Sequence, residues 1–169
     1  MKPQAETGIT LVELLISLAV LALLLGWGAP NLVELQARAR AKSQIDDLYQ
    51  DLRGARELAI TYVNSVTVCP LDSNNRCHND WHSGYRVFID TSPFGEFSSD
   101  DELIFERGKI ATGDFISSTE KMFRFTTDGF TSDAGNIRYC PRSVDSNHRQ
   151  QLTISTTGGV RYNDTPNQC

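Results

Sequence analysis

The chain has 169 residues, a formal net charge of −5 at pH 7 and four cysteines. This length allows one modest domain beside an apolar N-terminal segment, and the negative charge argues against broad nucleic-acid binding, leaving room only for a local basic patch. The even number of cysteines, in a chain whose N-terminus has the character of an exported protein, favours disulfides and an oxidising compartment.

The first predicted element is an apolar helix that carries a single acid. No charged side chain occurs from Leu14 to Ala29, and about twenty residues from Ile9 onward are apolar apart from Glu13 and a few small polar residues. At a rise of 1.5 Å per residue, twenty residues span roughly 30 Å, one hydrocarbon thickness. Because a charge at membrane depth costs roughly 2.5 kcal/mol or more, Glu13 is a candidate functional residue.

Three interpretations of this segment compete: a secretory signal peptide, a plain membrane anchor, or a segment cut before its apolar run. A signal peptide would gain nothing from Glu13 at the start of its apolar core. Cleavage between Gly8 and Ile9 instead creates a positively charged α-amino group. Glu13 then has a partner four residues away, either its own N-terminus or that of a neighbouring copy. Burial of this pair in an assembly would offset much of the desolvation cost.

The stretch G-ITLVELL, residues 8–15, resembles the cleavage and methylation motif of type IV prepilins and pseudopilins. That family has a short polar leader ending in Gly and an apolar helix whose fifth mature residue is Glu. The resemblance implies cleavage after Gly8 by a prepilin peptidase, N-methylation of Ile9, and residence in the inner membrane before assembly with other minor and major pilins. Pro30 matches a helix-disrupting proline of many pilins, and its missing N–H and ring clash should kink or locally melt the helix.

An amphipathic helix is predicted next, over residues 31–63. Apolar residues recur at three- and four-residue spacing and form one stripe; they are Ile45, Leu48, Leu52, Ala55 and Ala59. Charged residues are expected on the other faces; they are Asp46, Asp47, Asp51, Arg53, Arg56 and Glu57. The basic residues Arg38, Arg40 and Lys42 would by the positive-inside rule place the rest of the chain in the cytoplasm. The cysteines and the cleavage motif indicate the periplasm, and we prefer that placement.

Residues 64–169 are predicted to form a β-rich domain. Short runs such as SVTVCP, YRVFID, ELIFERG, MFRFTTDG, NIRYCP and LTISTTGGVRY are separated by Gly, Pro, Asn, Asp and Ser clusters. They predict one or two antiparallel sheets against the helix. The predicted fold class is α+β, a long kinked helix with a membrane half and an amphipathic half packed on an antiparallel β-sheet domain of the pilin type. The predicted organisation is a leader (1–8), a transmembrane assembly helix (9–30), an amphipathic helix (31–63) and a periplasmic β-rich domain (64–169).

A cysteine-bracketed loop opens this domain in the stretch CPLDSNNRCHNDWHSGYRVFID. Cys69 and Cys77 enclose turn-forming residues, which predicts a small disulfide. His78 and His82 give the loop a loose similarity to a zinc site, but exported thiols usually oxidise, so no metal is predicted. The stretch also resembles the GspH/FimT-type domain of FimU-like minor pilins and type II secretion minor pseudopilins; the residues that carry this resemblance are Trp81, Gly84, Val87, Phe88 and Asp90.

The remaining patterns predict a second disulfide and no catalysis. Four cysteines allow three pairings, and a local Cys69–Cys77 bond leaves Cys140 and Cys169 to close a loop of about 30 residues. The acidic run from Asp90 to Glu102 lacks the spacing of a calcium loop and is expected to be a solvated hairpin loop. The sequence contains neither a nucleophile elbow nor a nucleotide-binding glycine loop, so no cofactor is expected.

Basic residues concentrate near the C-terminus, where residues 138–169 have a net charge of +2. These candidate contact residues are Arg138, Arg142, Arg149 and Arg161. FimT-type relatives concerned with DNA uptake carry clustered arginines in this region, whereas GGVRY supplies only Arg161. Solvated strand faces and contacts with neighbouring pilins are therefore favoured over contacts with DNA.

The resemblance as a whole implies a non-enzymatic minor pilin of a type IV pilus that supports pilus assembly or initiation. Because tip subunits of such assemblies tend to lack the acid, the presence of Glu13 implies a place below the tip. The alternatives are a type II secretion minor pseudopilin and a FimT-like DNA-uptake minor pilin that binds DNA through its C-terminal arginines.

Overall fold

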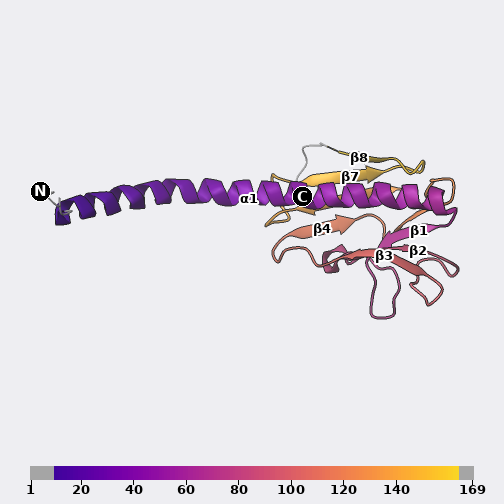
Figure 1. Cartoon of the computed structure of the whole chain (residues 1–169). Helices are drawn as coiled ribbons and strands as arrows, with labels where there is room; N and C mark the ends of the chain where they lie inside the picture. The colour runs from indigo at the N-terminus through magenta and orange to yellow at the C-terminus, as the bar shows by residue number, and fades with distance from the viewer. Residues whose placement is uncertain (1–9, 164–169) are drawn as a thin grey trace, which may run out of the picture. The chain divides into compact units, whose positions relative to one another are not determined.

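The computed structural model describes residues 10–163, except for the side chains of residues 25 and 27–31. Residues 1–36 and 37–169 form two units, and each is described by itself. Helix α1 (Leu11–Tyr62) runs through the first unit and into the second, where the eight strands are found (Figure 1).

The first unit is the N-terminal part of α1. Thr10 precedes the helix, and its hydroxyl oxygen accepts a hydrogen bond from the Glu13 amide at 3.3 Å. Thr10 thus acts as the N-cap, satisfying one of the amides that the first turn leaves without a helical partner. The helix continues through Pro30, so the proline does not melt the backbone locally. The predicted kink at this residue stays a prediction.

The second unit begins with the remainder of α1, whose apolar stripe faces the sheets as the spacing predicts. The stripe residues are at most 3% exposed; they are Ala37, Ala41, Ile45, Leu48, Leu52, Ala55 and Ala59. One acid departs from the predicted pattern, because Asp51 is buried among these residues and does not lie on an outer face. Its partners are on the sheet and are described below.

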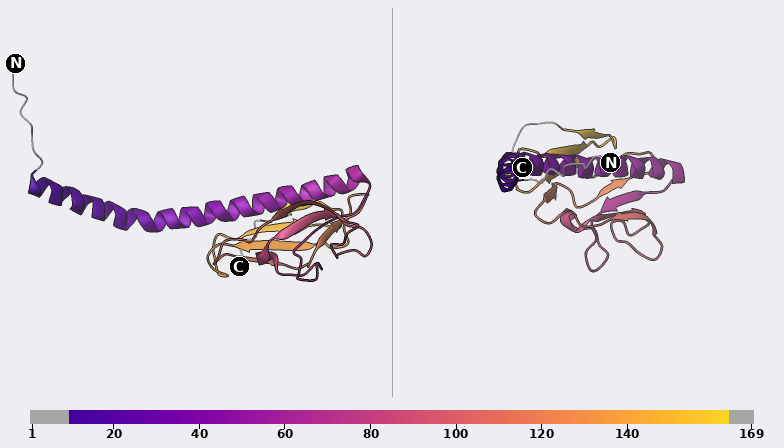
Figure 2. Two further views of the ribbon diagram at one scale, coloured as in Figure 1. Left: turned by 60° about the horizontal axis from the view of Figure 1, so that its bottom comes forward. Right: turned by 60° about the vertical axis from the view of Figure 1, so that its left-hand side comes forward.

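Two four-stranded antiparallel sheets pack on this part of α1, in the orders β3-β2-β1-β5 and β4-β6-β7-β8 (Figures 1 and 2). The first sheet contains β1 (Val66–Cys69), β2 (Tyr85–Ile89), β3 (Glu102–Arg107) and β5 (Phe123–Phe125). The second contains β4 (Phe115–Ser118), β6 (Gly135–Cys140), β7 (Gln150–Ile154) and β8 (Val160–Tyr162). The α+β fold class and the antiparallel pairing are confirmed. Strand β4 is the one that the sequence patterns did not predict.

The main core lies between α1 and both sheets. Side chains alternate between the two faces of a strand, so Val66 and Val68 of β1 point toward the helix together with Phe123 and Phe125 of β5. The second sheet contributes a matching set to the same core; its members are Ile137, Tyr139, Leu152, Ile154 and Val160. One continuous apolar interior thus holds the helix and both sheets together.

A second, smaller core covers the opposite face of the first sheet. It consists of Phe88 and the two cysteines of the predicted local disulfide, with three partly buried residues around them; these are Leu71, Phe97 and Met122. The residues come from the sheet, from the loops after β1 and β2, and from the segment between β4 and β5. Strand β1 is therefore buried on both faces, which explains its uniformly apolar or small side chains.

Candidate assembly surface

The N-terminal part of α1 exposes its large apolar side chains on all sides. Thirteen of them are 43–74% exposed; they are Leu11, Val12, Leu14, Leu15, Ile16, Leu18, Val20, Leu21, Leu23, Leu24, Leu32, Val33 and Leu35. A helix that is apolar all round is stable when it is surrounded by lipid or by other helices. Within the part of the chain whose side chains are described, no helix is both long enough and apolar enough to cross a membrane.

Glu13 is the acidic side chain at the N-terminal end of this surface and lies in the first helical turn, whereas the acid Glu34 lies near its other end. A negative charge there interacts favourably with the positive end of the helix dipole. The Ser17 hydroxyl donates a hydrogen bond to the Glu13 carbonyl oxygen at 2.8 Å. The hydroxyls of Thr10 and Ser17 thus both bind the helix backbone. Gly8 and Ile9 lie outside the described residues, and cleavage and methylation there stay predictions.

Buried Asp51 fastens α1 to the first sheet. Arg107 of β3 donates two hydrogen bonds to its carboxylate, from Nε at 2.8 Å and from Nη2 at 2.9 Å. The Tyr85 hydroxyl of β2 donates a third bond at 2.6 Å. Burial and the neighbouring Asp51 carboxylate raise the pKa of Tyr85 well above its usual value, so this phenol remains a donor. A bidentate Arg–carboxylate pair of this kind also fixes the orientation of both groups.

Buried Asp114 makes the corresponding attachment to the second sheet. Arg40 of α1 donates to its two oxygens at 2.6 and 2.9 Å, and the Tyr139 hydroxyl of β6 donates at 2.6 Å. The backbone amide of Arg142 adds a fourth hydrogen bond at 2.9 Å. Burial by itself would raise the pKa of Asp114, but these hydrogen bonds and the Arg40 charge outweigh it and hold the pKa below its usual value.

Sequence analysis missed both attachments, for different reasons. Asp51 lies three residues after Leu48 and four before Ala55, so helical spacing alone places it on the buried stripe. Asp51 was nevertheless assigned to a solvated face because acidic residues usually occupy such faces. Asp114 lies in a turn before the unpredicted strand β4, where no periodic pattern indicates burial. Both acids hold the second part of α1 to a sheet.

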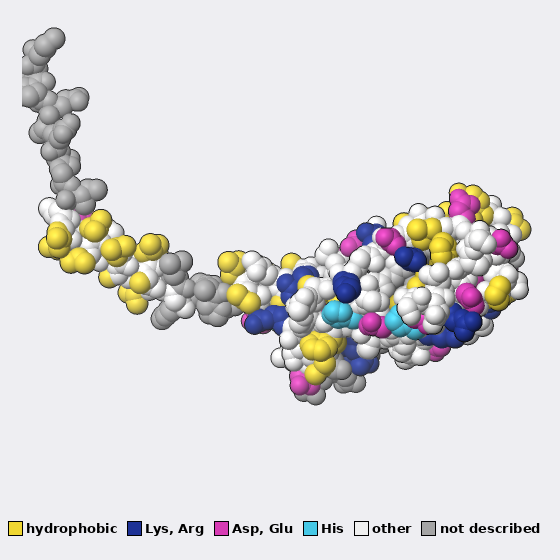
Figure 3. Space-filling view, turned by 90° about the horizontal axis from the view of Figure 1, so that it is seen from below, with side chains coloured by type: hydrophobic (Ala, Val, Ile, Leu, Met, Phe, Trp, Pro, Cys, Tyr) yellow, Lys and Arg dark blue, Asp and Glu magenta, His cyan; other side chains and the backbone are white. Residues whose placement is uncertain are grey.

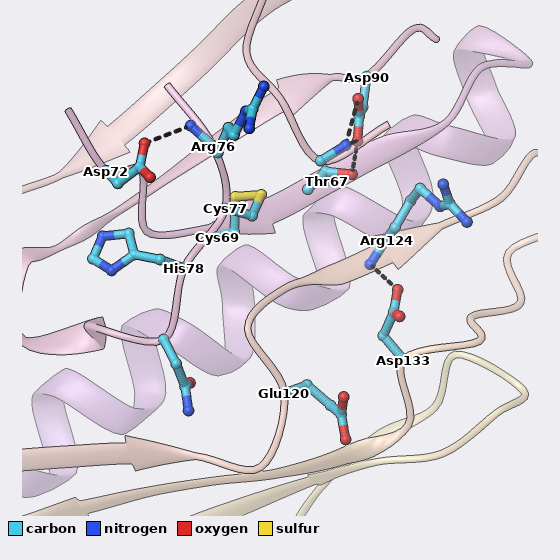
Figure 4. Close-up of a disulfide and its surroundings, with 12 residues drawn as sticks. Thr67, Cys69, Asp72, Arg76, Cys77, His78, Asp90, Glu120, Arg124 and Asp133 are labelled. Atoms are coloured by element: carbon cyan, nitrogen blue, oxygen red, sulfur yellow. Dashed lines mark hydrogen bonds between the residues drawn. A yellow bond between two sulfur atoms is a disulfide. The ribbon is translucent and has the colours of Figure 1, made fainter. Parts of the chain in front are cut away.

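The predicted disulfide between Cys69 and Cys77 is confirmed, with a Cα–Cα distance of 5.5 Å (Figure 4). Inside the loop, the Asp72 carboxylate accepts hydrogen bonds from the amides of Asn74 and Arg76. Cys140 lies at the buried end of β6. Its predicted partner Cys169 lies outside the described residues, so that pairing stays a prediction.

The residues around Trp81 that carry the GspH-type resemblance have structural roles. The buried Trp81 indole donates hydrogen bonds to the Asn79 side chain and to the Glu120 carbonyl oxygen, both at 3.1 Å. Gly84 has φ = 95°, and a Cβ there would lie 2.2 Å from the Arg107 carbonyl oxygen. Only glycine fits such a close approach. The pattern therefore maintains the fold, and none of these contacts forms a reactive site.

Asp90 corrects the expectation of a solvated acidic loop. This residue is fully buried, accepts a hydrogen bond from the Thr67 hydroxyl and accepts another from the Gly95 amide at 3.0 Å (Figure 4). Burial raises its pKa above the usual value. Asp101 also acts locally, accepting hydrogen bonds from the backbone and side chain of both Thr91 and Ser98. These acids organise the loop between β2 and β3.

Metal-ligand geometry is not found near the histidines of the cysteine loop. The sulfur atoms of Cys69 and Cys77 are joined to each other, and Nδ1 of His78 accepts a hydrogen bond from the Asp80 amide at 3.2 Å. Over residues 10–163, no group of three or more His, Cys, Asp or Glu side chains converges as a metal site would require.

The C-terminal arginines divide between a sheet face and a loop. Arg138 lies opposite Gln151, and Arg161 lies opposite Thr153, two residues further along β7. Both arginines therefore project from the face of the second sheet that is turned away from α1. Burial, with the Arg138 charge, lowers the pKa of Arg149, which lies in the loop just before β7. Arg142 lies in the loop after β6, next to Asp114.

Comparison with solved structures shows the same fold in two proteins of known class. The type IV minor pilin FimU of Pseudomonas aeruginosa PAO1 is 16% identical, with a TM-score of 0.60, over 78% of this chain and 94% of FimU. The minor pseudopilin EpsH from the type 2 secretion system of Vibrio cholerae is 15% identical, with a TM-score of 0.53, over 73% of this chain and 95% of EpsH. No protein of curated function matches the sequence significantly.

Two sequence families match the chain directly. The prokaryotic N-terminal methylation motif covers residues 4–29, the segment that contains G-ITLVELL. The family described as type II transport protein GspH covers residues 44–158, which include the inner part of α1 and nearly all of the two sheets. The predicted resemblance to pilin-like proteins with a GspH-type domain is thereby confirmed, and the chain belongs to the GspH family.

Proposed function

We propose that this protein is a minor pilin of a type IV pilus. It is held in the inner membrane by residues 9–30 and then enters the filament below the tip, where it supports assembly or initiation. The role is structural and not enzymatic. The observation that carries this proposal is the placement of Glu13 in the first turn of α1, whose N-terminal part exposes its large apolar side chains on every side.

The exposed helix supports an assembly role because its surroundings have to come from outside the chain. Side chains such as Leu15 and Leu23 are more than half exposed, and transfer of such surface out of water is favourable by about 25 cal/mol per Å². Lipid satisfies this requirement before assembly, and neighbouring helices satisfy it afterwards. Glu13 adds selectivity, since a buried carboxylate needs a cationic partner. The α-amino group created at Ile9 in a neighbouring subunit supplies that partner.

A type II secretion pseudopilin is the second candidate function. The matching family is described as a type II transport protein, and EpsH has the same fold. Both functions use the same processing and the same helix, so they differ in which filament accepts the subunit. Co-purification of the tagged chain with sheared surface pili supports the type IV assignment. Exclusive co-purification with a pseudopilus supports the secretion assignment.

Processing gives the first experimental test. Intact-mass measurement of the mature protein is expected to show a chain that begins at Ile9, with the added mass of one methyl group. Such a start is what supplies an amine for Glu13. A mature chain that begins near Ala29 would indicate a signal peptide and would overturn the anchor.

Substitution of Glu13 gives the second test. Glu13→Gln keeps the size of the side chain and removes its charge, so the variant is expected to remain stable in the membrane but to enter filaments at least tenfold less often. Ser17→Ala is the matched control, one helical turn further on, and is expected to assemble normally. Normal incorporation of Glu13→Gln would show that the acid does not recognise a neighbouring amine.

A further inference from the structure

Cations from two distant segments meet at one end of the 37–163 unit. Nε of Arg38 donates a hydrogen bond to Nε2 of His148 at 3.3 Å, joining the start of this part of α1 to the loop after β6. The second connection passes through Asp114, which binds both the Arg40 guanidinium and the Arg142 amide. Lys and Arg side chains, in dark blue, are visible at this end of the domain and also elsewhere on the face that Figure 3 shows. We define the basic end as the cations of α1 and of strand β6 with the loop after it; they are Arg38, Arg40, Lys42, Arg138, Arg142 and Arg149.

The basic end has an excess of positive charge in a chain that is negative as a whole. Among the described residues, its carboxylates are Asp114, which binds Arg40, Asp46, which lies 3.1 Å from Lys42, Asp145 in the loop, and Glu34, one helical turn before Arg38. The six cations thus outnumber these four acids by two, against a net charge of −5 for the whole chain. Arg38 and Arg142 are exposed, and the Lys42 side chain is 69% exposed.

Arg142 has an unusual backbone for an arginine. Its φ is 65°, in the left-handed region that glycine and asparagine adopt more easily. The Arg142 amide donates to Asp114 at 2.9 Å, which holds this conformation in place. A position that would favour glycine therefore carries an exposed arginine, whose amide shares the Asp114 carboxylate with Arg40 of α1. Strained positions of this kind are often kept for a functional side chain.

The position of these cations along α1 indicates what they meet. Exposed apolar side chains continue to Leu35, and Arg38 lies three residues later, about one helical turn or 4.5 Å. Anionic headgroups begin where the hydrocarbon layer ends. We propose that, in the membrane-anchored state of the proposed pilin, the basic end binds the headgroups of anionic phospholipids. Each cation near such a surface strengthens contact by about fivefold.

This contact also accounts for the conflict between the basic residues after the apolar run and a periplasmic domain. Arg38, Arg40 and Lys42 are not a cytoplasmic signal in this interpretation, because each has a partner within the folded domain. Arg38 binds His148 and Arg40 binds Asp114, while Lys42 pairs with Asp46 and lies over the Tyr162 ring. Their position is set by the folded domain. The lipid contact would hold the domain against the bilayer until assembly removes the subunit.

Hydrogen exchange on the full chain in nanodiscs tests this inference. We compare discs of phosphatidylcholine with discs that also contain phosphatidylglycerol, and expect amides of residues 141–149 to exchange at least threefold more slowly in the anionic discs. The protection is expected to disappear at high salt, since the Debye length falls to about 3 Å at 1 M. The variant Arg38→Glu with Arg142→Glu should abolish it. The matched control, Arg53→Glu with Arg76→Glu, reverses exposed cations elsewhere on the domain and should retain it.

Each outcome has a distinct meaning. Failure of the chain to enter nanodiscs would contradict the membrane anchor, and with it the proposed function. Entry with equal exchange in both kinds of disc would overturn the lipid contact alone. Equal protection by inorganic phosphate in neutral discs would show an anion site that is unrelated to the membrane, and protection that requires another pilin would show a protein interface; either result would overturn the lipid contact. Thermal unfolding in detergent confirms that both double variants are folded before exchange is measured.

Discussion

The two parts of α1 contain similar leucines in opposite surroundings. Leu18 and Leu21, in the first unit, are about half exposed, whereas Leu48 and Leu52, in the second, are at most 2% exposed. The helix is continuous across both, so secondary structure does not explain the contrast. The second part has two sheets of its own chain to pack against. The large apolar side chains of the first part are exposed, which is the pattern of a helix that packs on lipid or on other helices.

The largest expected effect tests this contrast with one substitution in each part. Leu52→Ala is expected to lower the free energy of unfolding by about 3 kcal/mol, because it removes buried methyl groups and leaves a cavity. Leu18→Ala is expected to change it by less than about 0.5 kcal/mol, as for most exposed sites. Urea denaturation of the full chain in detergent, monitored by tryptophan fluorescence, measures both. Equal losses would show that the first part of α1 also packs on the domain.

The disulfide tests the second core of the first sheet. Cys69 and Cys77 are eight positions apart, and loss of their bond is expected to lower the free energy of unfolding by about 2.5 kcal/mol. The double variant Cys69→Ser with Cys77→Ser, measured beside the wild-type chain, gives this difference. The bond lies outside the helix. The variant is therefore expected to assemble normally at temperatures where its domain is folded, and to fail only where the domain unfolds. An assembly defect at a temperature where the domain is folded would assign the loop a direct contact.

Asp51 tests whether α1 is held to the first sheet by charge as well as by apolar packing. Asp51→Ala is expected to cost about 2 kcal/mol, less than the 3–5 kcal/mol typical of a fully buried pair, because the Arg107 side chain is 45% exposed. Glu57→Ala is the matched control on the same helix. Its ion pair with Arg53 is solvent-exposed and is expected to contribute less than about 0.5 kcal/mol. Chemical denaturation at neutral pH compares the two variants.

The smallest expected effect is the acid dependence of the second attachment. The pKa of Asp114 is lower in the folded state than in the unfolded state, so its contribution is complete above the unfolded value near 4 and is lost as the pH falls through the folded value. Asp114→Asn should therefore differ most from wild type at pH 7 and least near pH 2. Unfolding curves measured across this range test whether the stability difference between wild type and Asp114→Asn shrinks as the pH falls.

Asp90 serves as a control because its pKa is shifted in the opposite direction from that of Asp114. Burial raises its pKa in the folded state, so the folded protein holds the proton more tightly and gains stability as the pH falls toward the unfolded value. Asp90→Asn should remove that gain. If both variants change the pH profile in the same direction, the two environments have been assigned wrongly.

Periodicity and motif residues were sufficient for much of the architecture. Spacing of Ile45, Leu48 and Leu52 correctly predicts which side of α1 is buried, and the short β-rich runs correspond to seven of the eight strands. Phe115–Ser118 was not predicted, because its residues are partly exposed and half of them are serine. The local disulfide was predictable because two cysteines with turn-forming residues between them are close in space in almost any fold.

The sequence by itself determined the apolar helix, the position of Glu13 and the amphipathic continuation, because these depend on residues three or four positions apart. Only the tertiary structure decided that Asp51 and Asp114 are buried attachments, since their partners Arg107 and Arg40 are 56 and 74 residues away. The same applies to the basic end, in which Arg38 meets a loop 110 residues further along the chain. Local sequence patterns assign these charged side chains to solvent. Their partners lie near them only in the folded domain, where the sheets pack on the helix. Their desolvation is therefore a property of the packed domain.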